Sequence, residues 1–196
     1  ELAANDEFGK IYVFSRRSLN FSHPKLENRI INFEQISQVE AISGIDMCFC
    51  ALGTTQGKSG KNGLFKVDHD YVLETAQWCK TNGVPTFAVV SSIMANPQAN
   101  SFYLRTKGKM EQGLTHLQFP TLYIFRPSLL TGKREEFRWI EKMGEFIYRL
   151  LQPIMVGKLR RMRSVSGLQV ALCMIDHAMN PQPGTFTIES DKIQNY

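Results

Sequence analysis

Residues 86–107 read TFAVVSSIMANPQANSFYLRTK. The stretch opens with an apolar run that ends in two hydroxyl side chains, Ser91 and Ser92. An uninterrupted apolar run is typical of a strand buried on both faces of a sheet. The residues that follow, 101–116, have the composition of a helix. The stretch therefore predicts one strand-and-helix repeat of an α/β fold.

The same alternation of strands and helices extends over the rest of the chain. It predicts a parallel sheet wound on both faces, a Rossmann-like α/β fold, with ligand sites at the carboxyl ends of the strands. We expect a single domain, residues 1–196, with a small substrate-side lobe around 133–165. The expected strands are 10–15, 29–33, 46–53, 86–92, 121–127 and 185–190, and the expected helices are 70–81, 101–116, 136–151 and 166–179.

The first residues, ELAANDEFG at 1–9, resemble the end of a helix. A dinucleotide-binding fold places a strand and a glycine-rich phosphate loop before such a helix, and neither pattern precedes it here. We therefore expect the sheet to lack its first strand and the glycine-rich loop. Strands 10–15 and 46–53 would then flank an empty or otherwise filled central slot.

Composition restricts the class of protein. A chain of 196 residues with 43% hydrophobic and 21% charged residues suits one globular domain. The net charge of +5 mildly favours an anionic ligand, such as a phosphorylated cofactor. The sequence contains no apolar run of about 18 residues and no signal-peptide pattern, so we expect a cytoplasmic protein.

The cysteines and histidines do not suggest metal binding. Cys48, Cys50, Cys79 and Cys173 have no partner pair at metal-ligand spacing, so we expect reduced, mostly buried thiols and no metal site. The histidines are scattered, and we assign none of them a catalytic role.

Tyr103 and Lys107 are the candidate catalytic pair. Four residues apart on a helix, they share one face. A nearby ammonium favours the tyrosinate form, so Tyr103 could exchange a proton with a carbonyl or alcohol oxygen. Ser91 or Ser92, at the carboxyl end of the preceding strand, could hydrogen-bond the same oxygen. The alternatives are an exposed tyrosine beside a solvated lysine, and a serine that only caps the next turn.

Ser15, Arg16 and Arg17 follow the first expected strand. NAD-binding folds usually place an acidic residue here to hold the adenosine ribose, whereas a hydroxyl with arginines suits a 2′-phosphate. The sequence has no Asp or Glu between Lys10 and Leu26. This pattern predicts NADP(H) as the cofactor, and two solvated surface arginines are the alternative.

Residues 52–63, LGTTQGKSGKNG, imitate two phosphate-binding motifs without matching either. The glycine spacing before GKS is one residue too short for a P-loop, and the segment follows a later strand than the dinucleotide fingerprint requires. We expect a flexible loop over a ligand, in which Leu52, Gly53 and Thr54 approach the cofactor through their backbone. A plain surface loop is the alternative for residues 58–62.

Five ordered motifs carry a resemblance to a known family: GKIYVFSRR, CALGTTQGKSG, VVSS, FYLRTKGKME and IFRPSLLTG. The chain resembles the short-chain dehydrogenase/reductase superfamily from Phe8 to about Ile188. It is more closely similar to the Tat-interacting-protein oxidoreductases and their bacterial relatives, which resemble nucleoside-diphosphate-sugar epimerases.

The resemblance implies an NADP(H) cofactor and a role for each candidate residue. Tyr103 would be the acid/base, Lys107 would hold the nicotinamide ribose and tune Tyr103, and Ser91 or Ser92 would assist. The backbone from Pro127 to Leu129 would approach the nicotinamide.

The implied activity is NADP-dependent oxidoreduction of a small carbonyl or alcohol substrate. An NADPH-binding regulatory or scaffold protein with little turnover is the alternative, since both functions need the same pocket. We expect no nucleic-acid partner. Residues 136–163 combine helical apolar spacing with the basic run KLRRMR. They predict a core-facing helix with a solvated basic end, or else a surface for an acidic membrane or a protein partner.

Overall fold

The computed structural model describes residues 1–131 and 162–196. The expected helix 136–151 lies outside the described residues. So do the predicted lobe 133–165 and the candidate partner surface 136–163, apart from their last few residues.

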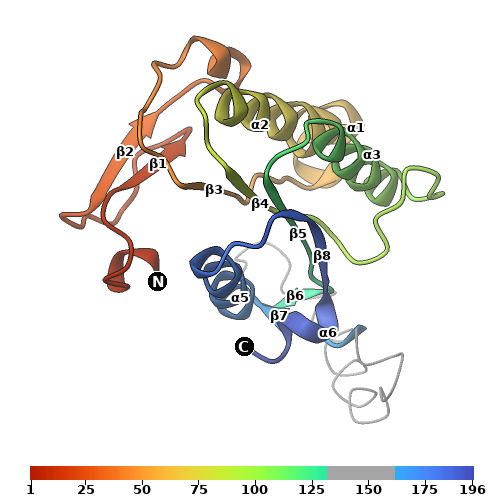
Figure 1. The fold of residues 1–196 in the computed structure, drawn as a ribbon. Coiled ribbons are helices and arrows are strands. Elements are labelled where there is room, and N and C mark those ends of the chain that lie inside the picture. Colours follow the sequence, from red (N-terminus) through yellow and green to blue (C-terminus); the bar gives the residue numbers. More distant parts are fainter. Residues whose placement is uncertain (132–161) are drawn as a thin grey trace.

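The central sheet has four parallel strands. Their order is β3-β4-β5-β8, and each strand is parallel to its neighbours (Figure 1). This arrangement confirms the α/β fold class predicted from the alternating pattern. The strands are β3 (Met47–Cys50), β4 (Thr86–Val90), β5 (Thr121–Arg126) and β8 (Gly184–Glu189).

Two further strands, β1 (Ile11–Ser15) and β2 (Leu26–Ile30), form a separate parallel pair. In the described part of the chain β1 and β3 belong to different sheets, so they do not pair directly, as predicted. β2 begins three residues before the predicted strand 29–33. It also ends three residues early, at Ile30, because Asn32 accepts a hydrogen bond from the Glu34 N–H and thereby starts the 3-10 helix η2 (Phe33–Gln38).

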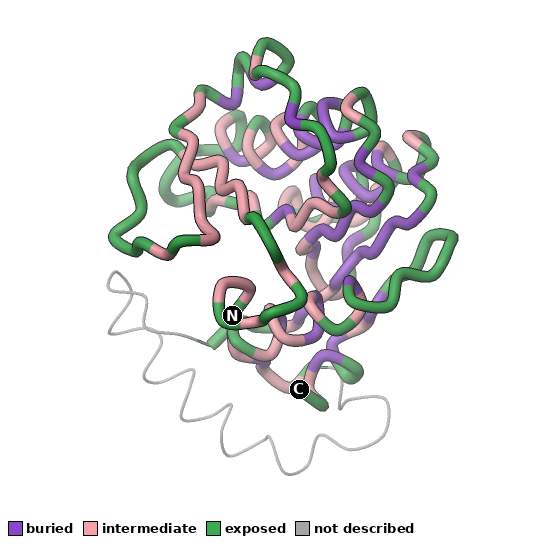
Figure 2. Tube along the Cα trace, turned by 60° about the vertical axis from the view of Figure 1, so that its left-hand side comes forward, coloured by how far each residue is buried: buried purple, intermediate pink, exposed green. Residues whose placement is uncertain are grey.

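Alternate residues of the central strands pack into two different cores. Phe87 and Val89 of β4 belong to the core shared with α2 (Tyr71–Thr81) and α3 (Phe102–His116). Ala88, between them, belongs to the core formed with α5 (Gly167–Met179). Figure 1 shows helices on both sides of the sheet, and Figure 2 shows that buried residues concentrate on the central strands and the inner helix faces.

Three predicted helices are confirmed to within one residue, and the remaining short elements complete the chain. α5 begins as its sequence requires, because Ser166 and Gln169 form a reciprocal capping box. The remaining described elements are η1 (Leu2–Ala4), α1 (Gln56–Phe65), the π-helical turn η3 (Lys66–Asp70), β6 (Leu130–Thr131), β7 (Val165–Ser166) and α6 (Ser190–Ile193).

The prediction of a flexible loop over residues 52–63 is wrong from Gln56 onward. From Gln56 the chain forms α1, which is kinked at Gly60, where φ is +67°. The glycines make this segment a poor helix former. The helix forms nevertheless, because Leu64 is fully buried and α1 continues into η3 and α2 while contacting α3.

The four cysteines are unpaired thiols, and all except half-buried Cys48 are buried, as predicted. Burial raises the pKa of both Cys50 and Cys173 to about 12, which keeps these thiols neutral. Within residues 1–131 and 162–196, no group of three or more His, Cys, Asp or Glu side chains could hold a metal ion.

Candidate functional site

The carboxyl ends of β3, β4 and β5 lie at one edge of the sheet. The register pairs Cys50 with Val89 and Val90 with Phe125, so the segments that follow these strands emerge side by side. A hydrogen bond from the Ile93 N–H to the Pro127 carbonyl, 2.9 Å long, ties two of the segments together. The structure therefore brings three predicted groups to the edge where α/β proteins bind ligands: 52–54, 91–92 and 127–129.

Lys107 reaches the same edge from α3. Its residue is only 3% exposed, and its Nζ lies 3.3 Å from the carbonyl oxygen of Val90, the last residue of β4. Tyr103 lies one helical turn earlier and is partly buried. Among residues 1–131 and 162–196, the Tyr103 hydroxyl makes no hydrogen bond. The alternative interpretation, a solvated lysine beside an exposed tyrosine, is therefore wrong for Lys107, which is buried.

Asp68 is a site residue that the sequence analysis missed. It lies on η3, and its carboxylate Oδ1 is 2.9 Å from Lys107 Nζ, with both side chains almost fully buried. Its Oδ2 accepts a hydrogen bond from the Thr54 N–H at 2.7 Å. Nothing in the run VDHDYV separates Asp68 from Asp70, because only the folded turn shows which carboxylate faces inward.

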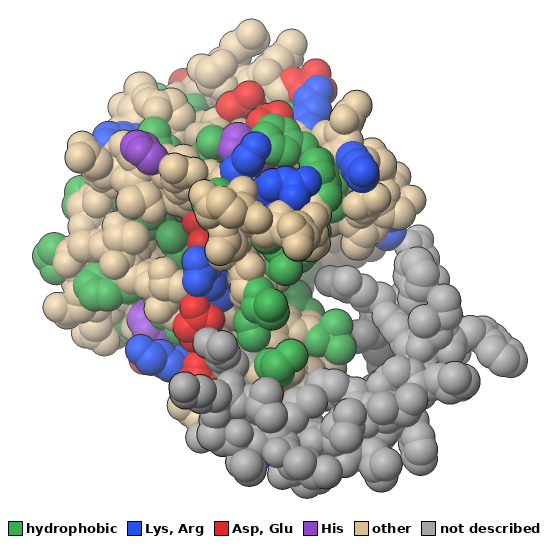
Figure 3. All heavy atoms as spheres, turned by 90° about the vertical axis from the view of Figure 1, so that its right-hand side faces the viewer, with side chains coloured by type: hydrophobic (Ala, Val, Ile, Leu, Met, Phe, Trp, Pro, Cys, Tyr) green, Lys and Arg blue, Asp and Glu red, His purple; other side chains and the backbone are tan. Residues whose placement is uncertain are grey.

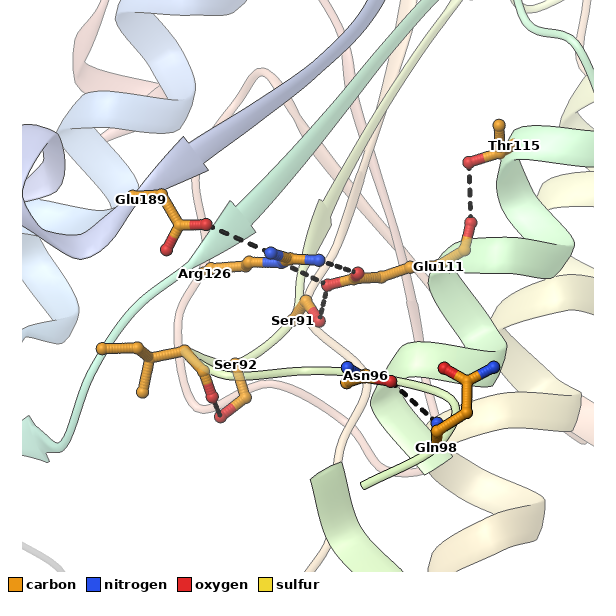
Figure 4. Close-up of polar contacts among 9 residues, drawn as sticks. Ser91, Ser92, Asn96, Gln98, Glu111, Thr115, Arg126 and Glu189 are labelled. Carbon is orange, nitrogen blue, oxygen red and sulfur yellow. Dashed lines mark hydrogen bonds and ion pairs between the residues drawn. The ribbon is translucent and has the colours of Figure 1, made fainter. Parts of the chain in front are cut away.

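Ser91 is part of a partly buried polar network near the edge (Figure 4). Its Oγ donates a 2.5 Å hydrogen bond to Glu111 Oε1, and Arg126 forms an ion pair with each of Glu111 and Glu189. The carboxylate of Glu111 raises the pKa of Arg126, and the carboxylate of Glu189 adds a smaller contribution in the same direction. The network joins the segment after β4 to α3, β5 and β8. Within it, the Ser91 hydroxyl already donates its hydrogen bond to Glu111.

Ser92 is less constrained. It is half-buried, and its Oγ makes one long hydrogen bond, 3.3 Å, to the carbonyl of Ile93 (Figure 4). A hydroxyl held this weakly can turn toward a ligand, whereas the Ser91 hydroxyl would first have to leave Glu111. The geometry thus separates two serines that the sequence left equivalent.

The turn after β1 presents two arginines. The Ser15 hydroxyl donates to the Arg17 carbonyl at 2.6 Å and accepts from Asn28 Nδ2 at 2.7 Å. Ser15 therefore shapes the turn, while Arg16 and Arg17 are exposed. In the part of the chain that the structure describes, neither arginine forms an ion pair.

Apolar side chains also lie exposed on the loops at this edge. Met94 follows Ser92, and Leu129 follows β5; each is 64% exposed. Met94 has a φ of +61°, an unusual conformation for a residue other than glycine. Figure 3 shows hydrophobic side chains gathered on the lower part of the face it presents. Exposed apolar groups beside hydroxyls and a buried ammonium suit a small organic ligand.

A parallel sheet with helices on both faces is the architecture of Rossmann-like NAD(P)-binding proteins, and the chain is an atypical, short-chain dehydrogenase/reductase-like member of that class. The chain is 30% identical to protein HTATIP2 of Rattus norvegicus over 196 residues, covering 98% of this chain and 79% of that protein. The chain belongs to the HTATIP2 family. No protein-family model matches it.

Solved structures confirm the Rossmann-like fold. MoeE5 in complex with UDP-glucose and NAD superposes with a TM-score of 0.65 and 14% identity, covering 92% of this chain and 68% of MoeE5. The UDP-N-acetylglucosamine 4-epimerase of Methanobrevibacter ruminantium M1 gives a TM-score of 0.63 and 16% identity, covering 92% of this chain and 68% of the epimerase.

The comparisons overturn the predicted cytoplasmic location. Protein FMP52-1, mitochondrial, of Scheffersomyces stipitis is 42% identical over 140 residues, covering 68% of this chain and 61% of that protein. Protein fmp52, mitochondrial, of Emericella nidulans is 36% identical over 153 residues, covering 74% and 66%. Because these relatives carry mitochondrial names, the cytoplasmic prediction is wrong. No helix within the described residues has the length and apolarity needed to cross a membrane.

Proposed function

We propose that the protein binds NADP(H) at the carboxyl edge of its sheet and catalyses oxidoreduction of a small carbonyl or alcohol. One observation carries the proposal: the buried Lys107 ammonium, one helical turn from Tyr103, is held against Val90, the last residue of β4, which lies two residues before Ser92. The NAD bound in the structural relative MoeE5 supports a nicotinamide dinucleotide as the cofactor.

The residues at this edge fit such a cofactor. Arg16 and Arg17 are exposed cations, which suits the 2′-phosphate of NADP(H). Gly53 is exposed and has no side chain, so the backbone after β3 can approach a ligand closely. The backbone of residues 127–129 would lie on the nicotinamide side.

When bound, the nicotinamide ring would supply or accept a hydride. The Tyr103 hydroxyl gives a proton to the carbonyl oxygen in reduction and takes it back in oxidation. The Ser92 hydroxyl donates a hydrogen bond to the same oxygen. Lys107 offers an N–H to the nicotinamide ribose. Met94 and Leu129 provide an apolar surface that excludes water from the substrate.

A regulatory or scaffold role for NADPH binding remains the second candidate. It is favoured by the buried ion pair between Lys107 and Asp68, because the ammonium already has a partner within the protein and can bind a cofactor without taking part in turnover. The two candidates differ in turnover and not in cofactor binding. From the names of the FMP52 relatives, we further propose a mitochondrial location.

Calorimetry tests the cofactor assignment. We expect the purified protein to bind NADPH more tightly than NADH by about 1.5–3 kcal/mol, the usual contribution of a charged hydrogen bond. The variant Arg16→Ala/Arg17→Ala should lose this preference and keep its NADH affinity. Lys10→Ala serves as the control, because Lys10 is an exposed cation at the opposite end of the same strand. Equal affinities for the two nucleotides in the wild-type protein would remove the phosphate assignment.

A further inference from the structure

The Asp68 carboxylate contacts two parts of the proposed cofactor site at once. Oδ1 lies 2.9 Å from Lys107 Nζ, and Oδ2 accepts the Thr54 N–H at 2.7 Å. A Cβ atom at Gly53 would lie 3.4 Å from Oδ1, so the carboxylate also lies directly against the segment that follows β3. One side chain thus joins the catalytic helix α3 to the segment expected to contact the cofactor.

The Lys107 ammonium makes two hydrogen bonds within the described residues and has one further N–H donor. An ammonium carries three N–H groups. Asp68 accepts one, and the Val90 carbonyl, 3.3 Å away, accepts a second. Within residues 1–131 and 162–196 no group accepts the third. With two donors fixed by the protein, the direction of the third is fixed as well.

The ion pair is poorly suited to a purely stabilising role. The side chains of Lys107 and Asp68 are only 4% and 2% exposed. Removing two charges from water costs free energy that their attraction only roughly repays, so a buried pair is weak evidence for stability. A fixed geometry for the ammonium is the benefit that remains.

We propose that Asp68 is a positioning residue for the cofactor. It holds the Lys107 ammonium at the carboxyl end of β4, in a fixed relation to the Thr54 backbone, so that the third N–H donor is presented to the nicotinamide ribose. The inference rests on the function proposed above. It assigns a role to a side chain that no motif in the sequence singled out.

The test is a double-mutant cycle read out by NADPH affinity. Its members are the wild-type protein, Asp68→Asn, Lys107→Met and Asp68→Asn/Lys107→Met, with dissociation constants for NADPH and NADH measured by nicotinamide fluorescence. Asp70→Asn is the matched control, because Asp70 lies on the same turn but is half-exposed and paired with His69. Asp68→Glu keeps the charge and moves it by one methylene, and it replaces Asp68→Asn if that variant does not fold.

We expect Asp68→Asn, like Asp68→Glu, to weaken binding of both nucleotides by about tenfold or more, as the loss of one charged hydrogen bond would. In the Lys107→Met background the same change should have little effect, and Asp70→Asn should bind as the wild type does. Wild-type affinity in both Asp68 variants, or an equal loss in both backgrounds, would overturn the positioning role. A wild-type protein that binds neither nucleotide would instead overturn the proposed function itself.

Discussion

At the scale of single residues, the structure gives Ser91 and Ser92 different surroundings. Both follow the same buried strand, so the sequence offered no basis for choosing between them. Ser91 is 3% exposed and bonded to Glu111, whereas Ser92 is half-buried and weakly bonded. Ser91 therefore belongs to the framework of the site, and Ser92 is the better candidate for contact with substrate.

Single-alanine variants of the two serines should separate these roles. Ser92→Ala should lower turnover of a carbonyl substrate by about 10²-fold, the usual cost of losing one hydrogen-bond donor to a reacting oxygen. Its free energy of unfolding should change by less than about 0.5 kcal/mol. Ser91→Ala should lower the free energy of unfolding by about 1–2 kcal/mol and change turnover only a few-fold. Urea unfolding and initial rates measure both effects, and the reverse pattern would show that the roles are exchanged.

The residues that the sequence analysis missed share a physical cause. Tyr103 and Lys107 are neighbours on one helix, so their spacing alone placed them together. Asp68 and Arg126 act through partners on other elements, and those partners become neighbours only when the sheet and helices assemble. A single sequence carries no signal for such contacts.

At the scale of elements, α3 is held very close to the loop that follows β4. The Asn96 N–H donates to the Leu104 carbonyl at 3.1 Å. A Cβ atom at Gly108 would lie 2.2 Å from the Asn96 carbonyl carbon and 2.3 Å from the Pro97 nitrogen. Only glycine permits this approach, which sets the position of the helix turn that carries Lys107.

Two glycines on α3 provide a matched comparison. Gly108→Ala should lower the free energy of unfolding by about 1–3 kcal/mol, because backbone atoms must move, and it should weaken NADPH binding by displacing Lys107. At Gly113 the nearest atom to a new Cβ is the Leu73 Cδ1 at 2.8 Å, at the end of a flexible side chain. Gly113→Ala should therefore be nearly neutral, helped by the higher helix propensity of alanine. Equal destabilisation of the two variants in urea would contradict the close-packing argument.

Element boundaries show where local sequence patterns suffice. The strands β4 and β5 and the helices α2, α3 and α5 were predictable, because apolar runs and capping residues define them. α1 was not predictable, because its glycine-rich sequence disfavours a helix and burial of Leu64 outweighs that preference.

At the scale of the whole molecule, the sequence predicted the fold class and the separation of β1 from β3. Regular alternation of strands and helices leaves few arrangements other than a doubly wound parallel sheet. Cellular location was not predictable in the same way. Neither composition nor the absence of an apolar span specifies a cellular compartment. The cytoplasmic prediction was wrong, because relatives carry mitochondrial names.

The central claim is that Tyr103 transfers a proton to or from a substrate oxygen while bound NADP(H) would supply or accept the hydride, and turnover tests it most directly. Oxidation of NADPH should be followed with a panel of small aldehydes and ketones, for the wild-type protein and for Tyr103→Phe. We predict that at least one compound is reduced and that Tyr103→Phe lowers kcat/KM by about 10² to 10⁴-fold, since the variant keeps the ring but loses the proton. The affinity for NADPH should stay within about twofold, because the phenol acts on the substrate oxygen. Wild-type turnover in Tyr103→Phe would contradict the assignment, and NADPH binding without turnover of any compound would favour the regulatory role.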